Sequence, residues 1–272
     1  MTDHLSDPPT TDSLTFVGTA TTVLRLGSFT LLTDPNFLHR GQRAYLGKGM
    51  WTRRLTEPAL CVDQLPTLDA VLLSHLHGDH FDRVARRSLS RDQPVLTTPA
   101  AARRLDRWGF TTVGLHTWGE QQLHRDGETL TVTAVPAVHA RGALRALLPS
   151  VMGSVVEHRV DDVVRRRVYV SGDTVTGPHL TEIARRHPDL DVAVVHLGGT
   201  RVLWHTVTMD APQGVELLRT VPTQQVVPVH HDDYRVFRDP LSRFVQLARS
   251  QGLGDRLTPV GRGETVALAG RD

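Results

Sequence analysis

The order of apolar and polar residues predicts three short strands at the start of the chain, over residues 14–18, 21–26 and 28–34. Gly18 and Gly27 separate these strands, so we expect an antiparallel opening to the fold. A segment rich in Pro, Gly and Arg follows over residues 34–66. Because structureless connectors of this length are uncommon in compact domains, we expect this segment to form a wall or lid.

From residue 68 onward, apolar runs of strand length alternate with helical patterns. Strands are predicted over residues 69–74, 94–99, 111–116, 130–139, 151–158, 166–174, 191–199, 224–231 and 263–268. Helices are predicted over residues 81–89, 100–110, 178–187, 209–221 and 239–252, the last capped by Asp239. Two sheets with helices outside them would bury every apolar strand face in this pattern. The prediction is an α/β fold in a single domain over residues 1–272, with residues 1–12 as a mobile leader.

Composition narrows the class of protein. With 39% hydrophobic and 22% charged residues, the chain is globular rather than disordered. The formal charge is +2, and the arginines are scattered without a basic block that alternates with aromatics, so we expect no nucleic-acid partner. Cys61 is the single cysteine, which excludes a disulfide framework and a thiolate cluster. The chain shows no signal peptide and no transmembrane segment, so a cytoplasmic protein is expected.

Ligand-type side chains stand where several predicted strands end. The run SHLHGDH follows the apolar run VLL, and three later strands end in a histidine or an aspartate. The candidate metal ligands are His75, His77, Asp79, His80, His139, Asp173 and His230. Imidazole and carboxylate suit zinc, with manganese or iron as alternatives. Seven ligands are too many for one tetrahedral ion, so two divalent cations are expected, with Asp173 suited to bridge them.

These residues and their order resemble the metallo-β-lactamase superfamily, through HLHGDH, a later strand-terminal histidine, SGDT and the histidine after QQVVPV. The resemblance implies a four-layer αββα sandwich with a dinuclear site at one edge. It also implies that His75, His77 and His139 hold the first metal. Asp79, His80 and His230 would then hold the second, with Asp173 between them. FVGTATTVLRLGSFTLLTDP and PVHHDDYRVF are similar to the branch that contains ascorbate-phosphate lactonase and N-acyl phosphatidylethanolamine phospholipase D.

The expected function is a metal-dependent hydrolase that uses a dinuclear-metal-activated hydroxide. Two cations lower the pKa of a shared water from about 15.7 toward about 7. An ester, lactone or phosphodiester in a small-molecule or lipid-like substrate would suit this chemistry. Asp79 could orient the hydroxide, and His205 or Tyr234 could protonate the leaving group. The alternatives are a single-iron oxygenase of the same fold and a non-catalytic binding protein that retains the fold.

Several polar residues near these strand ends could each have one of two structural roles. Asp34 could accept a hydrogen bond from a ligand imidazole or be a turn residue before proline. His196 could lie near the site or simply end a buried strand. His231 should point away from His230, which favours a supporting role over ligation.

Overall fold

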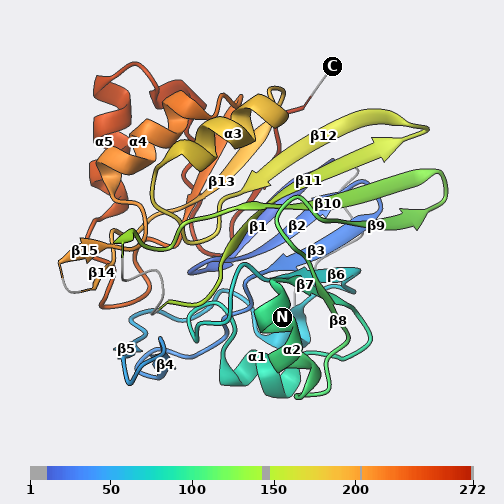
Figure 1. The fold of residues 1–272 in the computed structure, drawn as a ribbon, viewed down its shortest axis with the longest axis horizontal. Coiled ribbons are helices and arrows are strands. Elements are labelled where there is room, and N and C mark those ends of the chain that lie inside the picture. Colours follow the sequence, from blue (N-terminus) through green and yellow to red (C-terminus); the bar gives the residue numbers. More distant parts are fainter. Residues whose placement is uncertain (1–10, 143–147, 203, 271–272) are drawn as a thin grey trace, which may run out of the picture.

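Two β-sheets lie face to face, with helices outside each of them (Figure 1). The computed structural model describes residues 11–142, 148–202 and 204–270. The first sheet contains, in spatial order, β17 (Thr265–Ala267), β1 (Ser13–Gly18), β2 (Thr21–Leu26), β3 (Phe29–Thr33), β6 (Ala70–Leu72), β7 (Val95–Thr97) and β8 (Thr112–Gly114). The second contains β16 (Gln225–Val229), β13 (Val192–His196), β12 (Val163–Val170), β11 (Met152–Val160), β10 (Glu128–Pro136) and β9 (Glu120–Arg125).

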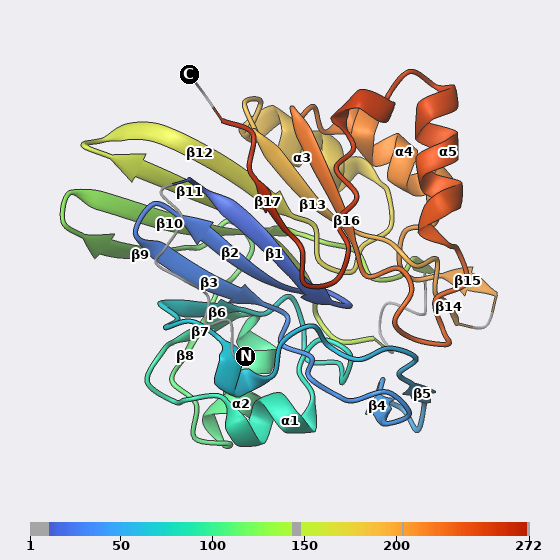
Figure 2. The same cartoon turned by 180° about the vertical axis from the view of Figure 1, so that it is seen from behind.

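Both sheets mix antiparallel and parallel pairing. Tight turns join β1, β2 and β3 into the expected antiparallel meander, and β3, β6, β7 and β8 then run parallel. In the second sheet, β9 to β12 are antiparallel, whereas β12, β13 and β16 are parallel. Parallel neighbours need a long crossover, which is where helices occur along the chain. Figure 2 shows β17, near the end of the chain, beside β1 of the first strand pair.

Three apolar clusters fill the spaces between four layers. The central cluster joins the facing sheets, with Leu31 from the first sheet and Val194 from the second among its members. Another cluster lies between the second sheet and helices α3 (Pro178–Arg186), α4 (Ala211–Thr220) and α5 (Leu241–Ser250). A third lies between the first sheet and helices α1 (Arg83–Ser88) and α2 (Pro99–Asp106). The predicted αββα sandwich is therefore confirmed.

The structure also contains short elements that the sequence pattern did not indicate. Residues 34–66 include the ribbon β4 (Arg43–Tyr45) and β5 (Trp51–Arg53) and the 3-10 turn η1 (Val62–Gln64). A second ribbon, β14 (Arg201–Val202) with β15 (His205–Thr206), follows β13, and a 3-10 turn, η3 (Gly254–Arg256), follows α5. Strand β9 was also missed, because most of its side chains are partly or fully exposed and polar. A ribbon that leaves most of its side chains in solvent has little apolar patterning to detect.

One local expectation was wrong. Asp239 does not cap α5: its carboxylate accepts from the backbone N–H of Ala211 at 2.6 Å, at the start of α4, and pairs with Arg243 at 3.1 Å. Asp12, expected in a mobile leader, accepts from Gly27 N and from Arg166 Nε, each at 2.8 Å. Residues 1–10 of that leader lie outside the described residues. No helix in the described part of the chain is long and apolar enough to cross a membrane.

Candidate metal centre

Seven ligand-type side chains meet where the two sheets come together. The segment after β6 in the first sheet supplies His75, His77, Asp79 and His80. The ends of β10, β12 and β16 in the second sheet supply His139, Asp173 and His230. All seven are buried, with at most 9% of any residue exposed. The sequence-predicted residues are thus brought together from four separate strand ends.

The first group consists of His75, His77 and His139, whose ligand-type nitrogens lie within 4.8 Å of one another. The distance between His75 Nε2 and His77 Nδ1 is 2.9 Å. The His139 ring lies 5.0 Å from the His75 ring and 5.3 Å from the His77 ring, centroid to centroid. Three imidazoles that face one point can supply three of the four ligands of a tetrahedral metal site.

The second group consists of Asp79, His80 and His230, also within 4.8 Å. Asp79 Oδ2 lies 3.5 Å from His230 Nε2 and 3.9 Å from His80 Nε2. Asp173 Oδ2 lies between the groups, 3.3 Å from His80 Nε2 and 3.9 Å from His139 Nε2. His75, His80 and Asp173 also have ligand-type atoms within 4.8 Å of one another, so the two groups adjoin.

Hydrogen bonds on the outer side of three imidazoles orient the rings. His139 Nδ1 donates to the carbonyl of Val207 at 2.8 Å, and His230 Nδ1 donates to that of Leu197 at 3.1 Å. His80 Nδ1 lies 3.2 Å from the carboxylate of Asp34. With Nδ1 held by these acceptors, each ring turns its Nε2 toward the centre.

The centre contains buried polar atoms without a hydrogen-bond partner. Within the described residues, these are Asp79 Oδ1, His80 Nε2, His139 Nε2, Asp173 Oδ1 and His230 Nε2. Leaving one buried polar atom unsatisfied costs about 1–3 kcal/mol. Five such atoms directed at one small volume are the arrangement that a bound cation would satisfy.

The electrostatics also suit a cation. Burial lowers the pKa of His77 to about 4, and burial with the neighbouring His80 lowers the pKa of His75 well below its usual value. Both rings are therefore neutral ligands at pH 7. Burial alone would raise the pKa of Asp173, but His230 and His80 more than offset this and hold that pKa well below its usual value. The carboxylate is thus ionised.

Asp34 links two histidines and a serine beneath the centre. Its Oδ2 lies 3.2 Å from both His80 Nδ1 and His196 Nε2, and Ser74 Oγ donates to Oδ1 at 2.9 Å. Ser74 Oγ also lies 3.0 Å from His75 Nδ1. Of the two possible roles of Asp34, hydrogen bonding to a ligand imidazole is the one that the structure shows. His196 lies in the same network.

Three non-glycine residues at or beside this centre have a strained backbone. Thr19, Asp34 and His230 all have φ in the left-handed region, at 57°, 36° and 61°. His230 N donates to the carbonyl of Thr19 at 2.6 Å, so two of the strained residues support each other. Non-glycine residues in this region cost about 1–3 kcal/mol each and persist where the surroundings impose them.

Sequence reasoning missed a buried network next to the centre. Asn36 donates from Nδ2 to the carbonyl of Gly78 at 2.9 Å, which holds the HLHGDH turn. Its Oδ1 accepts from Arg54 and, at 3.0 Å, from the hydroxyl of Tyr234. Asn36 and Arg54 lie in the arginine-rich segment 34–66, where no pattern distinguishes them from turn or surface residues.

This network changes the interpretation of Tyr234. Its side chain is buried, its hydroxyl donates to Asn36, and burial raises the pKa of the phenol far above its usual value. Tyr234 therefore supports Asn36 and is not suited to protonate a leaving group. His205 is exposed on β15 and belongs to none of the groups of clustered ligand atoms among the described residues.

Gly78 allows a close backbone approach between the HLHGDH turn and β4. Gly78 N donates to the carbonyl of Tyr45 at 2.9 Å, and a methyl group at residue 78 would lie 2.7 Å from Tyr45 N. Gly78→Ala is therefore expected to lower the free energy of unfolding by about 1–3 kcal/mol, measured by urea denaturation. Gly177→Ala is the control, because its φ is extended and the methyl would meet only the His179 ring. Equal stability of the two variants would contradict the prediction.

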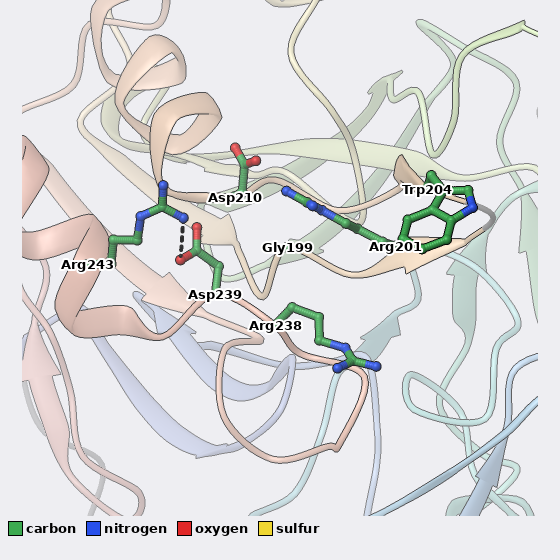
Figure 3. Close-up of a pocket in the computed structure, with 7 residues that line it drawn as sticks. All are labelled: Gly199, Arg201, Trp204, Asp210, Arg238, Asp239 and Arg243. Atoms are coloured by element: carbon green, nitrogen blue, oxygen red, sulfur yellow. Dashed lines mark hydrogen bonds and ion pairs between the residues drawn. The ribbon is translucent and has the colours of Figure 1, made fainter.

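Two cavities lie near the loops that hold the centre. One, of about 630 Å³, is lined by residues of the β13–α4 and β16–α5 loops and by the start of α5 (Figure 3). Figure 3 shows Arg243 paired with Asp239 on one side of it and Trp204 on the other. None of the seven clustered residues lines it. The other, of about 540 Å³, has Gly78 and one of the seven clustered residues, His77, in its lining.

Three comparisons place the chain among known proteins. The family model described as Beta-lactamase superfamily domain matches residues 30–231. An uncharacterized protein of Mycobacterium tuberculosis is 25% identical over 266 residues, covering 92% of this chain and 69% of that protein. An N-acyl-phosphatidylethanolamine-hydrolyzing phospholipase D of Caenorhabditis elegans is 26% identical over 242 residues, covering 81% of this chain and 64% of that protein. The crystal structure of isothiocyanate hydrolase from Delia radicum gut bacteria has a TM-score of 0.80 at 23% identity, covering 94% of this chain and 99% of that one.

Proposed function

Because the chain belongs to the β-lactamase superfamily, we propose that it is a metal-dependent hydrolase whose seven clustered residues hold two divalent cations. The observation on which this proposal depends is the set of buried, unpartnered nitrogens and oxygens that face one another in the centre. His75, His77 and His139 would hold one cation. Asp79, His80 and His230 would hold the other, with Asp173 between them.

The donor set fits zinc best, with manganese or iron as alternatives. Neutral imidazoles and ionised carboxylates suit borderline first-row cations, and no thiolate takes part because Cys61, the single cysteine, is exposed. Outer hydrogen bonds to Val207, Leu197 and Asp34 already set the ring orientations that ligation needs.

The residues around the centre would orient a nucleophile and exclude bulk water. Two bound cations would make a water molecule acidic enough to react near neutral pH and would polarise the bond under attack. Asp79 would accept a hydrogen bond from the attacking water, and its burial keeps competing solvent away. His205 stays a candidate proton donor to the leaving group.

An ester, lactone or phosphodiester in a small-molecule or lipid-like substrate is the proposed target. The Caenorhabditis elegans relative is a phospholipase, which supports a lipid-like substrate among these possibilities. A single-iron oxygenase is disfavoured by the complete second group of ligands. A non-catalytic binding protein is disfavoured because the family-type ligand set is complete.

Metal removal tests the proposal. Elemental analysis of purified protein is expected to return about two divalent ions per chain. Turnover in a screen of phosphodiester, lactone and thioester substrates is expected to disappear after chelation and to return with zinc or manganese. Full turnover by protein shown to be metal-free would overturn the proposal. One iron ion per chain would favour the single-iron oxygenase. No turnover of any substrate with any metal would favour the non-catalytic binding protein.

A further inference from the structure

The cavity beside His77 has walls from two separate parts of the chain. The β4–β5 ribbon forms one wall, and helices α1 and α2 form another, in agreement with their neighbouring positions in Figure 1 and Figure 2. His77 and Gly78 line the same cavity. A side chain added at Gly47, in the ribbon's turn, would come within 3.8 Å of His77 Nε2. A ligand in this cavity therefore lies next to the centre.

The cavity is strongly cationic. Its lining includes the basic residues Arg43, Lys48, Arg83, Arg86 and Arg104. None of them forms an ion pair with a carboxylate in the described part of the chain. Unpaired cations that converge on a concave surface attract and hold anions.

The one carboxylate in the lining does not neutralise this charge. Asp82 is buried, and both its oxygens accept backbone hydrogen bonds. Oδ2 accepts from Phe37 N and Leu38 N at 2.5 and 2.6 Å, and Oδ1 accepts from Val84 N and Ala85 N at 2.8 Å. Its hydrogen-bonding capacity is used to fix the start of α1 and the loop after β3.

The same cavity offers aromatic surface. Arg86 lies over the Trp108 ring at 4.0 Å, and Arg104 lies over it at 5.4 Å. On the opposite wall, the rings of Tyr45 and Trp51 lie 4.8 Å apart across the β4–β5 ladder. Tyr45 is 44% exposed and Trp51 is 59% exposed, so both present apolar surface that the fold itself does not cover.

We propose that this cavity is the substrate site and that the substrate is an anionic amphiphile, with a carboxylate, sulfonate or phosphate group attached to an apolar or aromatic body. The arginines of α1 and α2 hold the anionic group, and the aromatic side chains of the ribbon contact the apolar body. The scissile bond lies at the His77 end. This assignment rests on the proposed hydrolase function, which it makes more specific.

A matched pair of fluorescent probes tests the binding site without turnover. Anilinonaphthalene sulfonate is an anionic aromatic amphiphile, and phenylnaphthylamine is the same skeleton without the charge. The wild-type protein is expected to bind the sulfonate at least tenfold more tightly than the uncharged probe. The double variant Arg86→Met/Arg104→Met is expected to lose at least tenfold in affinity for the sulfonate, since a tenfold loss corresponds to about 1.4 kcal/mol in total and hydrogen bonds to charged groups reach that size singly. Its affinity for phenylnaphthylamine should change less than threefold.

The control is Arg87→Met/Arg103→Met, which makes the same change in net charge on the same two helices but outside the cavity lining. It should bind both probes like the wild type. Arg86→Lys/Arg104→Lys should recover most of the affinity for the sulfonate, and thermal melting should show that all variants are folded. Equal binding of the two probes by the wild type, or equal losses in the Met pair and the control pair, would overturn the proposal.

Repeating the probe titration on chelated protein separates this inference from the proposed function. Selective sulfonate binding that survives chelation, in protein that shows no turnover after zinc or manganese is restored, would contradict the hydrolase and leave the proposed anion site unchanged. Metal-dependent turnover with no preference between an anionic aryl ester and its neutral methyl derivative would contradict the proposal of an anionic substrate. The proposed hydrolase function would be unaffected.

Discussion

Asp79→Asn is expected to lower kcat/KM by about 10²–10³-fold while the protein stays folded. The side chain keeps its size, but it loses the negative charge that faces His80 and His230 across 3.9 and 3.5 Å. The same change removes one anionic ligand from the second group and the acceptor proposed for the attacking water. His80→Ala should have a comparable effect because His80 faces both Asp79 and Asp173.

Kinetics and elemental analysis of the same preparations check this prediction. Bound metal is expected to fall from about two ions to about one per chain, with a near-native circular dichroism spectrum. Asp162→Asn is the matched control, since Asp162 is exposed in the β11–β12 turn and the charge change is identical. If the Asp79→Asn protein kept the wild-type kcat/KM, the proposal that Asp79 takes part in the mechanism would be wrong.

Arg54→Met is expected to lower the free energy of unfolding by about 1–3 kcal/mol, because the buried carbonyl of Asn36 loses its donor while Asp233 keeps Arg262 at 3.0 Å. Arg54 is fully buried, as is the Asp233 carboxylate 3.7 Å away. Arg54 also donates to the backbone carbonyl of Asn36 at 2.9 Å and lies 5.9 Å from the centre of the Tyr234 ring. Its removal would leave the Tyr234–Asn36 hydrogen bond and the bond from Leu55 N to the carbonyl of Asp233 among the remaining contacts between segment 34–66 and the residues after β16.

Urea denaturation of Arg54→Met and Arg53→Met gives the comparison. Arg53 is the adjacent residue, it is exposed on β5, and its substitution should change the free energy of unfolding by less than about 0.5 kcal/mol. If both variants unfolded at the same urea concentration, the buried network would have no special part in stability.

The sequence predicted the elements whose patterns are local. Apolar runs of strand length located the buried strands, and apolar helical patterns located helices α1 to α5, because burial leaves a regular pattern in the residues themselves. The exposed ribbons β4–β5 and β14–β15 have no apolar pattern of this kind. The role of Asp239 was assigned wrongly for a related reason: a carboxylate before a helix can cap it, yet its partner here is the N–H of Ala211, 28 residues away.

The sequence by itself determined which side chains have the chemistry of metal ligands and that they stand at strand ends. Tertiary structure decided how close these side chains come to one another, since that depends on the packing of one sheet against the other. It also decided which ring nitrogen faces inward, through hydrogen bonds to remote residues. The partner of His139, for example, is Val207, which is 68 residues away in the sequence. Local patterns record burial and backbone geometry, whereas hydrogen bonds between remote segments depend on three-dimensional placement, and this is why Asn36 and Arg54 became visible only in the folded chain.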